Sequence, residues 1–341
     1  MIDEEPTGGN VGEARARLER ELERAFAEDP LVSIDDLART ASDVSRETTG
    51  RGGASGTPRA TKKKAKRDSR KTAEPAPESR PARARILAIV NQKGGVGKTT
   101  TAVNLAACLA VAERRTLLID LDPQGNATSG LGIEKGELES SVYDVLVGEQ
   151  PLRSAIRPTA IPYLEIVPAT VDLFGAEIEL VSAIGREHRL ANALEGQTAD
   201  YQYVLVDCPP SLGLLTVNAL TAVDAVLIPI QCEYYALEGL SQLLGTIRIV
   251  QKSLNPGLGI EGVLLTMYDQ RLNLARQVQE EAVEYFGEKV YATVIPRNVR
   301  LSEAPSFGQP VILYDILSAG AVSYMKLAEE LIERCRPRER G

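Results

Sequence analysis

The sequence lacks several residue types that would point to particular chemistries. It has 341 residues, no tryptophan, one histidine and four widely spaced cysteines without a C-x-x-C pair. This pattern argues against a metal site or a disulfide framework and favours free, buried thiols. Aromatic residues make up only 4% of the chain and hydrophobic residues 43%. The core must therefore be built from Val, Ile, Leu and Ala, as in a buried parallel sheet flanked by helices.

Long apolar runs and an apolar leader are also missing. No run approaches the ~20 residues that a membrane-spanning helix needs. The acidic start Met-Ile-Asp-Glu-Glu-Pro lacks the apolar region of a secretory signal. These absences predict a soluble, cytoplasmic protein with no membrane partner. The single histidine, His188, lies in a polar stretch without a nearby Ser or Cys motif, which favours a surface position over a catalytic one.

Charge is distributed unevenly along the chain. Residues 1–50 carry six Arg and thirteen Asp or Glu, a net charge of −7. Residues 51–83 carry eleven Lys or Arg and three acids, a net charge of +8. The whole chain has a net charge of −8, which leaves −9 for residues 84–341. Any DNA contact of this last part therefore needs a local basic patch, because its global charge repels nucleic acid.

Residues 1–83 are expected to form a largely disordered, low-complexity extension. One helix is predicted at 13–28, where three apolar residues recur at four-residue spacing. It is either a marginal, solvated helix or one that docks on a partner. Residues 43–83 are rich in Ser, Thr, Gly, Pro, Lys and Arg, which is typical of a disordered linker.

From residue 84 onward, strands and helices are predicted to alternate. Short β-rich apolar runs occur at 85–91, 116–121, 163–167, 203–208, 224–230, 260–267 and 290–295. Helix-like segments lie between most of them, at 98–112, 172–194, 213–222, 235–252, 274–286 and 318–335. This alternation predicts a single α/β domain over 84–341, with a doubly wound, mostly parallel sheet flanked by helices.

A glycine-rich loop follows the first predicted strand and precedes a predicted helix. Such a loop wraps backbone N–H groups around phosphates. We expect Lys98 to reach the β- and γ-phosphates and the Thr99 hydroxyl to bind Mg²⁺. The usual pattern G-x-x-x-x-G-K-[ST] fails, because Gln92 stands where its first glycine belongs, and an extra lysine, Lys93, opens the loop. The candidate nucleotide-binding residues are Lys93, Gly94, Gly95, Val96, Gly97, Lys98, Thr99 and Thr100.

Two carboxylates, Asp120 and Asp122, stand at the carboxyl end of the second predicted strand. Ligands of doubly wound sheets bind outside the carboxyl ends of the strands, so both acids are expected near the phosphates. Asp122 is the candidate for orienting the attacking water in phosphoryl transfer. Asp120 is a candidate for supporting the loop or for the metal shell. Either residue could instead only cap the turn before Pro123.

Asp207 lies near the end of the apolar strand predicted at 203–208 and is followed by Cys-Pro-Pro-Ser. A strand-end aspartate of this kind holds Mg²⁺ directly or through a water in P-loop NTPases. The signal is weak alone, since many strands end in Asp, but the upstream loop strengthens it. The predicted metal-site residues are Thr99, Asp207 and Asp120.

Five separate motifs follow one another along the chain, at 93–100, 122–132, 207–211, 295–306 and 310–315. Together they resemble the ParA/Soj chromosome-partition ATPases, a family of P-loop NTPases with a deviant phosphate loop. The resemblance runs from about residue 84 to 335 and does not cover the first eighty residues. It implies slow, Mg²⁺-dependent hydrolysis of ATP to ADP and phosphate, with ATP and Mg²⁺ as cofactors.

The same resemblance implies roles for particular residues. Lys93 is expected to reach the nucleotide of a second subunit in an ATP-dependent homodimer, where it offsets the charge of two ATP molecules. Lys93, Lys98 and Asp122 are then the catalytic candidates. Pro296 and Asn298 are expected beside the adenine.

DNA binding is a further implication of the resemblance. The dimer is expected to bind DNA without sequence preference through Arg271 and Arg300, with Arg297 as a weaker addition. Such contacts are salt-sensitive and read no bases. Without the resemblance, these arginines would pass for ordinary surface charges. A ParB-like centromere-binding partner and association with the nucleoid are also implied, while chromosome or plasmid cargo stays open.

Three other functions compete with DNA partitioning as interpretations of the sequence. A MinD-like, membrane-associated ATPase would need a C-terminal amphipathic helix, but the apolar residues of 318–335 suit packing on the sheet and the tail after Pro337 lacks bulky apolar residues. A redox protein of the nitrogenase-iron-protein type would need cysteines that bridge subunits, and Cys208 and Cys232 are not obviously placed for that. A non-enzymatic nucleotide-dependent scaffold would not need Asp122.

Overall fold

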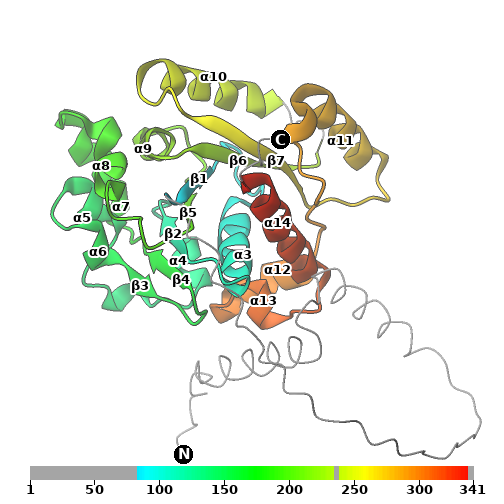
Figure 1. Cartoon of the computed structure of the whole chain (residues 1–341), viewed down its shortest axis with the longest axis horizontal. Coiled ribbons are helices and arrows are strands. Elements are labelled where there is room, and N and C mark those ends of the chain that lie inside the picture. Colours follow the sequence, from blue (N-terminus) through cyan, green and yellow to red (C-terminus); the bar gives the residue numbers. More distant parts are fainter. Residues whose placement is uncertain (1–82, 234–237, 337–341) are drawn as a thin grey trace, which may run out of the picture.

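A computed structural model describes residues 83–233 and 238–336. This part of the chain forms a seven-stranded sheet in the order β3-β4-β2-β5-β1-β6-β7, shown in Figure 1. The strands are β1 (Arg85–Ile89), β2 (Thr116–Asp120), β3 (Arg157–Pro158), β4 (Leu164–Val167), β5 (Tyr203–Asp207), β6 (Ala225–Gln231) and β7 (Gly259–Thr266). All neighbours pair in parallel except β3, which runs antiparallel to β4. The predicted fold class is confirmed.

Twelve α-helices accompany the sheet in the described ranges. They are α3 (Lys98–Val111), α4 (Asn126–Gly130), α5 (Val142–Val147), α6 (Leu152–Ala155), α7 (Leu173–Glu179), α8 (Arg189–Leu194), α9 (Leu214–Ala222), α10 (Glu238–Ser253), α11 (Asn273–Phe286), α12 (Val299–Glu303), α13 (Val311–Tyr314) and α14 (Ala319–Cys335).

The sheet separates two apolar layers. On β1, Ile86 and Ala88 enter one layer and Leu87 and Ile89 the other, because successive side chains point to opposite faces. The first layer also holds the buried side chains of α9, α10 and α11, and the second holds those of α3 and α14. Figure 1 shows α3 and α14 side by side on one face of the sheet. Both faces are thus covered, as parallel sheets require.

Two predicted elements are wrong. The expected strand at 290–295 makes only a bridge at Val290 and scattered bonds to β7. The N–H groups of Ala292 and Thr293 instead donate to the Glu330 carboxylate of α14, each at 2.9 Å. The expected helix at 172–194 is interrupted, since Gly185 adopts a left-handed φ of 68° between α7 and α8.

Short elements were not predicted. The strand β3 has two residues, and α4, α5, α6, α12 and α13 have four to six each, which is too few to show a periodic pattern. The predicted extension and its helix at 13–28 lie outside the described residues, apart from Arg83, whose guanidinium lies 2.9 Å from Asp224. Among the described helices, none has the length and apolar character to cross a membrane.

Candidate nucleotide-binding site

The glycine-rich loop joins β1 to α3 at the carboxyl edge of the sheet. Gly95 and Gly97 adopt left-handed φ values of 76° and 86°, which strain any residue with a Cβ. Gly97 caps α3, and no side chain caps its first N–H groups. The Thr266 hydroxyl at the end of β7 donates to the Val96 carbonyl at 2.8 Å and anchors the loop. The helix start therefore presents free donors and a positive dipole end to an anion.

Lys98 is buried at the base of this loop, with 6% of its surface exposed. Its Nζ donates to the Lys93 carbonyl at 3.1 Å, which folds the loop over the ammonium. Burial lowers the pKa of Lys98, and the nearby Asp207 and Asp122 carboxylates oppose this effect. Lys98, Asp207 and Asp122 therefore lie close enough to influence one another, and their shared role at a bound nucleotide stays a prediction.

Asp207 and Asp120 end adjacent strands and are register partners. Both side chains are fully buried. Neither oxygen of Asp207 has a well-formed hydrogen bond among the described residues. Burial raises the pKa of this carboxyl well above its ordinary value, and Asp120 adds to the effect, whereas the adjacent Thr99 hydroxyl and Lys98 lower it.

Asp120, in contrast, has its oxygens occupied. It accepts hydrogen bonds from the Thr128 N–H at 2.8 Å, the Thr128 hydroxyl at 2.7 Å and the Asp122 N–H at 3.2 Å. Burial raises its pKa to about 6, and these bonds act in the opposite direction. The Thr128 oxygen in turn accepts from the Ala169 N–H at 2.9 Å. This geometry fits the predicted loop-supporting role of Asp120 better than a place in the metal shell.

Asp122 lies two residues beyond the end of β2, with 7% of its surface exposed. Its Oδ1 accepts from the Gln124 N–H at 2.9 Å. Lys135 crosses over this turn, and its Nζ donates to the Gln124 carbonyl at 2.6 Å. The turn also needs Gly125, because a Cβ there would lie 2.7 Å from Lys135 and 2.8 Å from the Ala169 carbonyl. The carboxylate is thus held at the edge of the site.

Lys93 is partly exposed and pairs within its own chain. Its N–H donates to Asn91 Oδ1, and its Nζ lies 2.9 Å from Glu233 Oε2. Asn91 is fixed by its own bond to the Pro229 carbonyl at 2.8 Å. Glu233 was not predicted as part of the site; it follows β6 by two residues and carried no motif signal.

Pro296 and Asn298 lie beyond the end of β7. Pro296 forms a parallel bridge with Tyr268, and the Asn298 side chain accepts from the Arg300 N–H at 2.9 Å as the cap of α12. Since Thr266 holds the glycine-rich loop from the same strand end, the structure brings this pair to the loop side of the sheet. Their predicted contact with adenine stays a prediction.

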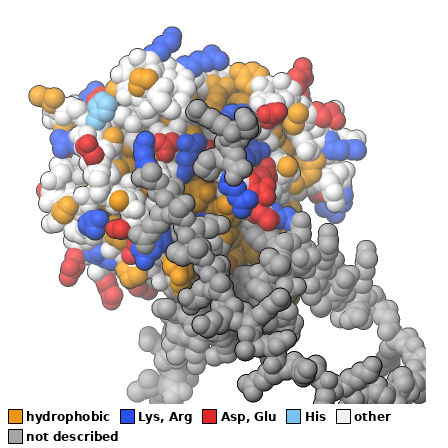
Figure 2. All heavy atoms as spheres, in the orientation of Figure 1, with side chains coloured by type: hydrophobic (Ala, Val, Ile, Leu, Met, Phe, Trp, Pro, Cys, Tyr) orange, Lys and Arg blue, Asp and Glu red, His pale blue; other side chains and the backbone are white. Residues whose placement is uncertain are grey.

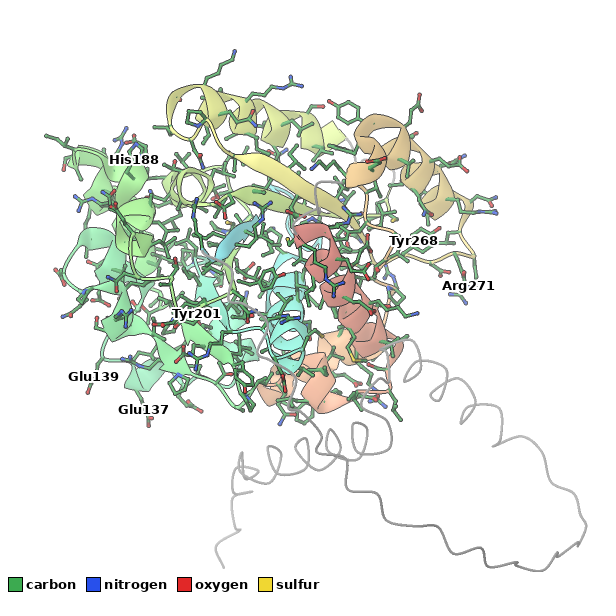
Figure 3. All side chains as sticks on the ribbon, in the orientation of Figure 1. Glu137, Glu139, His188, Tyr201, Tyr268 and Arg271 are labelled. Atoms are coloured by element: carbon green, nitrogen blue, oxygen red, sulfur yellow. The ribbon has the colours of Figure 1, made fainter. Side chains whose placement is uncertain are left out.

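The three predicted DNA-binding arginines are exposed, and two of them have acidic partners. Arg271 donates to both oxygens of Asp269, at 2.8 and 2.6 Å. These bonds lower the pKa of Asp269 to about 2. Arg300 lies 2.8 Å from Glu303 and 3.1 Å from Asp315. Figure 3 shows Arg271 at the rim of the molecule, beyond Tyr268, and Figure 2 shows basic and acidic side chains interspersed on the displayed face.

The two cysteine candidates have no exposed position. Cys208 directly follows Asp207, and both Cys208 and Cys232 are buried, so neither thiol is on the surface where a cluster shared between subunits would bind. Figure 3 shows His188 beside α8, at the periphery. In the described part, no group of three or more His, Cys, Asp or Glu side chains could hold a metal ion alone. A cation at Asp207 would therefore need oxygen ligands from a bound phosphate, which suits Mg²⁺.

Comparison with known proteins agrees with this geometry. The family model of an AAA domain matches residues 84–260. Soj, the sporulation initiation inhibitor protein of Bacillus subtilis, is 64% identical over 72% of this chain and 98% of its own length. The chromosome partitioning protein ParA of Myxococcus xanthus is 59% identical over 74% of this chain and 90% of its own length.

Two solved structures share the fold. One is a cobyrinic acid a,c-diamide synthase from Mycobacterium smegmatis with a bound ATP analogue and magnesium, at 40% identity and a TM-score of 0.64, covering 73% of this chain and 95% of that chain. The other is the septum site-determining protein MinD of Pyrococcus horikoshii with Mg-ADP, at 28% identity and a TM-score of 0.61, covering 72% and 95%. The chain belongs to the ParA/Soj family of chromosome-partitioning P-loop ATPases.

Proposed function

We propose that this chain binds ATP with Mg²⁺, hydrolyses it slowly and forms a homodimer in the ATP state. The observation that carries the proposal is the buried Asp207 carboxylate, which lacks a well-formed hydrogen bond among the described residues beside Lys98 and Thr99. A Mg²⁺ ion held by the Thr99 hydroxyl and by phosphate oxygens would neutralise phosphate charge and partner Asp207, directly or through a water. The magnesium nucleotides in the two solved structures support this assignment.

The glycine-rich loop would bind the phosphates. The N–H groups from Gly94 to Thr100 surround the anion at the start of α3, and Lys98 contacts the β- and γ-phosphates. Lys98 is already desolvated and folded under the loop, so little ordering is left to complete on binding. Pro296 and Asn298 would take the adenine from the β7 side.

Asp122 would orient the water that attacks the γ-phosphate. The Gln124 N–H fixes its carboxylate, and Lys135 and Gly125 fix the turn that carries it. Positioning of this kind supplies much of the catalysis in phosphoryl transfer. The carboxylate accepts a hydrogen bond from the water and holds its oxygen toward phosphorus.

Lys93 would complete the site of the second subunit. Its ammonium would leave Glu233 and contact the nucleotide across the two-fold axis, so that dimerisation depends on bound ATP. The dimer would hold DNA through Arg271, Arg300 and Arg297 from both subunits, with contacts to phosphates only.

We further propose that residues 84–341 form one ATPase domain behind the extension 1–83. The ParA/Soj relatives support a role in partitioning chromosome or plasmid DNA on the nucleoid, with a ParB-like centromere-binding partner that stimulates hydrolysis. The MinD-like alternative, an ATPase that positions itself on a membrane, finds less support. Tyr324, Leu327 and Leu331 of α14 are buried against α3 and the sheet, so this apolar face is not available to lipid.

The test is co-sedimentation with plasmid DNA and with anionic liposomes, each with and without ATP and Mg²⁺. We expect ATP-dependent pelleting with DNA only. The variant Asp122→Ala is expected to bind ATP, dimerise and stay on DNA without releasing phosphate. Normal turnover by this variant would remove Asp122 from its assigned role, and ATP-dependent pelleting with liposomes would favour the MinD-like function.

A further inference from the structure

The segment around α7 is apolar on both sides. Leu173, Ala176 and Leu180 face inward and are 0–3% exposed. On the other side, four large apolar side chains recur at spacings of three and four residues and remain open to solvent. This α7 stripe consists of Val171, Phe174, Ile178 and Val181, which are 67%, 53%, 77% and 60% exposed. An exposed row of large apolar side chains marks a contact surface more often than a solvated face, so a second surface is expected over the stripe.

The stripe lies at the edge of the sheet that carries the nucleotide site. It follows the carboxyl end of β4, and Ala169, two residues before it, is linked through Thr128 to Asp120. On its other flank, the Glu177 carboxylate lies so close to Gly213 that a Cβ on this glycine would overlap Glu177 Oε1. Gly213 ends the loop that starts after Asp207. Both loops of the site therefore contact residues that flank the stripe, Ala169 and Glu177.

We propose that the α7 stripe is the apolar core of the contact between two copies of this chain in the ATP-bound dimer; the inference rests on the dimerisation proposed above. The phosphate edge offers glycines, lysines and aspartates, which give charge and specificity but no apolar area. Stable interfaces bury about 800 Å² per partner around a core that is depleted of charge. The stripe is continuous with the phosphate edge and supplies that core.

The acidic residues beside the stripe are turned toward their own chain. Asp172 accepts from the Thr170 hydroxyl at 3.0 Å, Glu179 accepts from the Tyr143 hydroxyl at 3.0 Å, and Glu177 packs on Gly213. In a two-fold contact the same patch of each subunit faces its copy. Because the α7 stripe carries no charge, two copies of it can meet without repulsion between like charges.

A competing occupant is a basic segment of another protein, since no Lys or Arg occurs between Arg157 and Arg186. The contacts of the flanking residues Ala169 and Glu177 with both loops of the nucleotide site favour the second copy, because they connect the bound nucleotide to the position of the stripe. Binding of a basic segment of another protein to the stripe is one of the outcomes that the experiment distinguishes.

The experiment is sedimentation equilibrium of the full chain with a non-hydrolysable ATP analogue and Mg²⁺. We expect Ile178→Glu to weaken the dimer at least tenfold while nucleotide binding and the thermal midpoint stay near those of the wild type. The matched control is Ile249→Glu on α10, where the native side chain is 66% exposed, and it should dimerise like the wild type.

A second variant tests proximity directly. With Phe174→Cys, a short bismaleimide should cross-link two chains with the ATP analogue and not with ADP, above the background of the wild-type cysteines. If the wild type dimerises, Ile178→Glu dimerises equally well and Phe174→Cys gives no cross-link, this inference is overturned while the proposed dimerisation stands. If that intact variant dimer loses stimulation by a ParB-like protein, the stripe belongs to the other occupant. A wild type that stays monomeric with the analogue overturns the proposed dimerisation and this contact together.

Discussion

The Lys93 ammonium lies 2.9 Å from the Glu233 carboxylate of the same chain, although the two residues are 140 positions apart. The lysine that is proposed to reach a second subunit is therefore already paired with an acid of its own chain. Both side chains are about half exposed, at 40% and 49%, so the pair is worth roughly 0–1 kcal/mol.

Glu233→Gln should strengthen the ATP-dependent dimer, because Lys93 no longer has to leave a carboxylate. The gain is limited to about twofold to fivefold by the weakness of an exposed pair. Sedimentation equilibrium with an ATP analogue measures it. Asp200→Asn, which removes the exposed Arg153–Asp200 pair far from the loop, serves as the control. A dimer that is weaker in Glu233→Gln than in the wild type would show that Glu233 supports the active state.

Lys135→Met should slow hydrolysis and leave ATP affinity unchanged. Lys135 donates to the Gln124 carbonyl in the turn that carries Asp122, and losing one hydrogen bond of about 1 kcal/mol loosens that turn. We expect kcat to fall about fivefold. Single-turnover phosphate release and nucleotide titration separate the two effects, with the exposed Lys289→Met as a charge-matched control. An equal loss of ATP affinity would argue for a contact with the nucleotide instead.

Asp269→Asn and Arg271→Glu should change DNA affinity in opposite directions. Asp269 neutralises Arg271 through two hydrogen bonds, so its removal frees a cation for a phosphate, whereas Arg271→Glu deletes that cation. Fluorescence anisotropy with a random duplex at several salt concentrations measures both. The log-log salt slope should fall by about one per protomer in Arg271→Glu. Identical binding by both variants and the wild type would exclude Arg271 from the interface.

Gly262→Ala should destabilise the fold by about 1–3 kcal/mol through overpacking. A Cβ at this position of β7 would lie 2.5 Å from Tyr291 Cε2 and 2.8 Å from the Lys289 carbonyl. Gly245→Ala in α10 is the matched control, because nothing lies within 4 Å of its added Cβ and helix propensity favours alanine by roughly 0.5–1 kcal/mol. Urea denaturation should show opposite shifts, and a destabilised control would contradict the helix argument.

The local part of the site was predictable from the sequence. The strand, glycine-rich loop and helix from 85 to 111 are set by neighbours in the chain. Asp120 and Asp207 have the same sequence signature, an acid at the end of an apolar strand. Their difference depends on Thr128, which saturates only Asp120 and whose position is fixed by α4 and by its bond to Ala169.

Partners from distant segments were not predictable. Glu233 and Lys135 reach the site through the end of β6 and a surface turn, and neither stands in a motif. The segment 290–295 has the composition of a strand, yet Glu330 of α14 takes two of its N–H groups. A pattern of apolar residues predicts which side chains are buried. It does not predict which acceptor forms a hydrogen bond with a given backbone N–H group.

The packing of α14 on α3 has a consequence for the order in which the protein becomes functional during synthesis. The Thr101 hydroxyl near the start of α3 lies 3.1 Å from the Tyr324 hydroxyl, and both side chains are buried. The helix α14 follows the phosphate loop, Asp122 and Asp207 in the sequence, so a nascent chain that contains these residues but not yet α14 still exposes one side of the helix that begins with Lys98. We therefore expect the chain to bind nucleotide only after α14 has been synthesised, so that incomplete chains neither bind nor hydrolyse ATP.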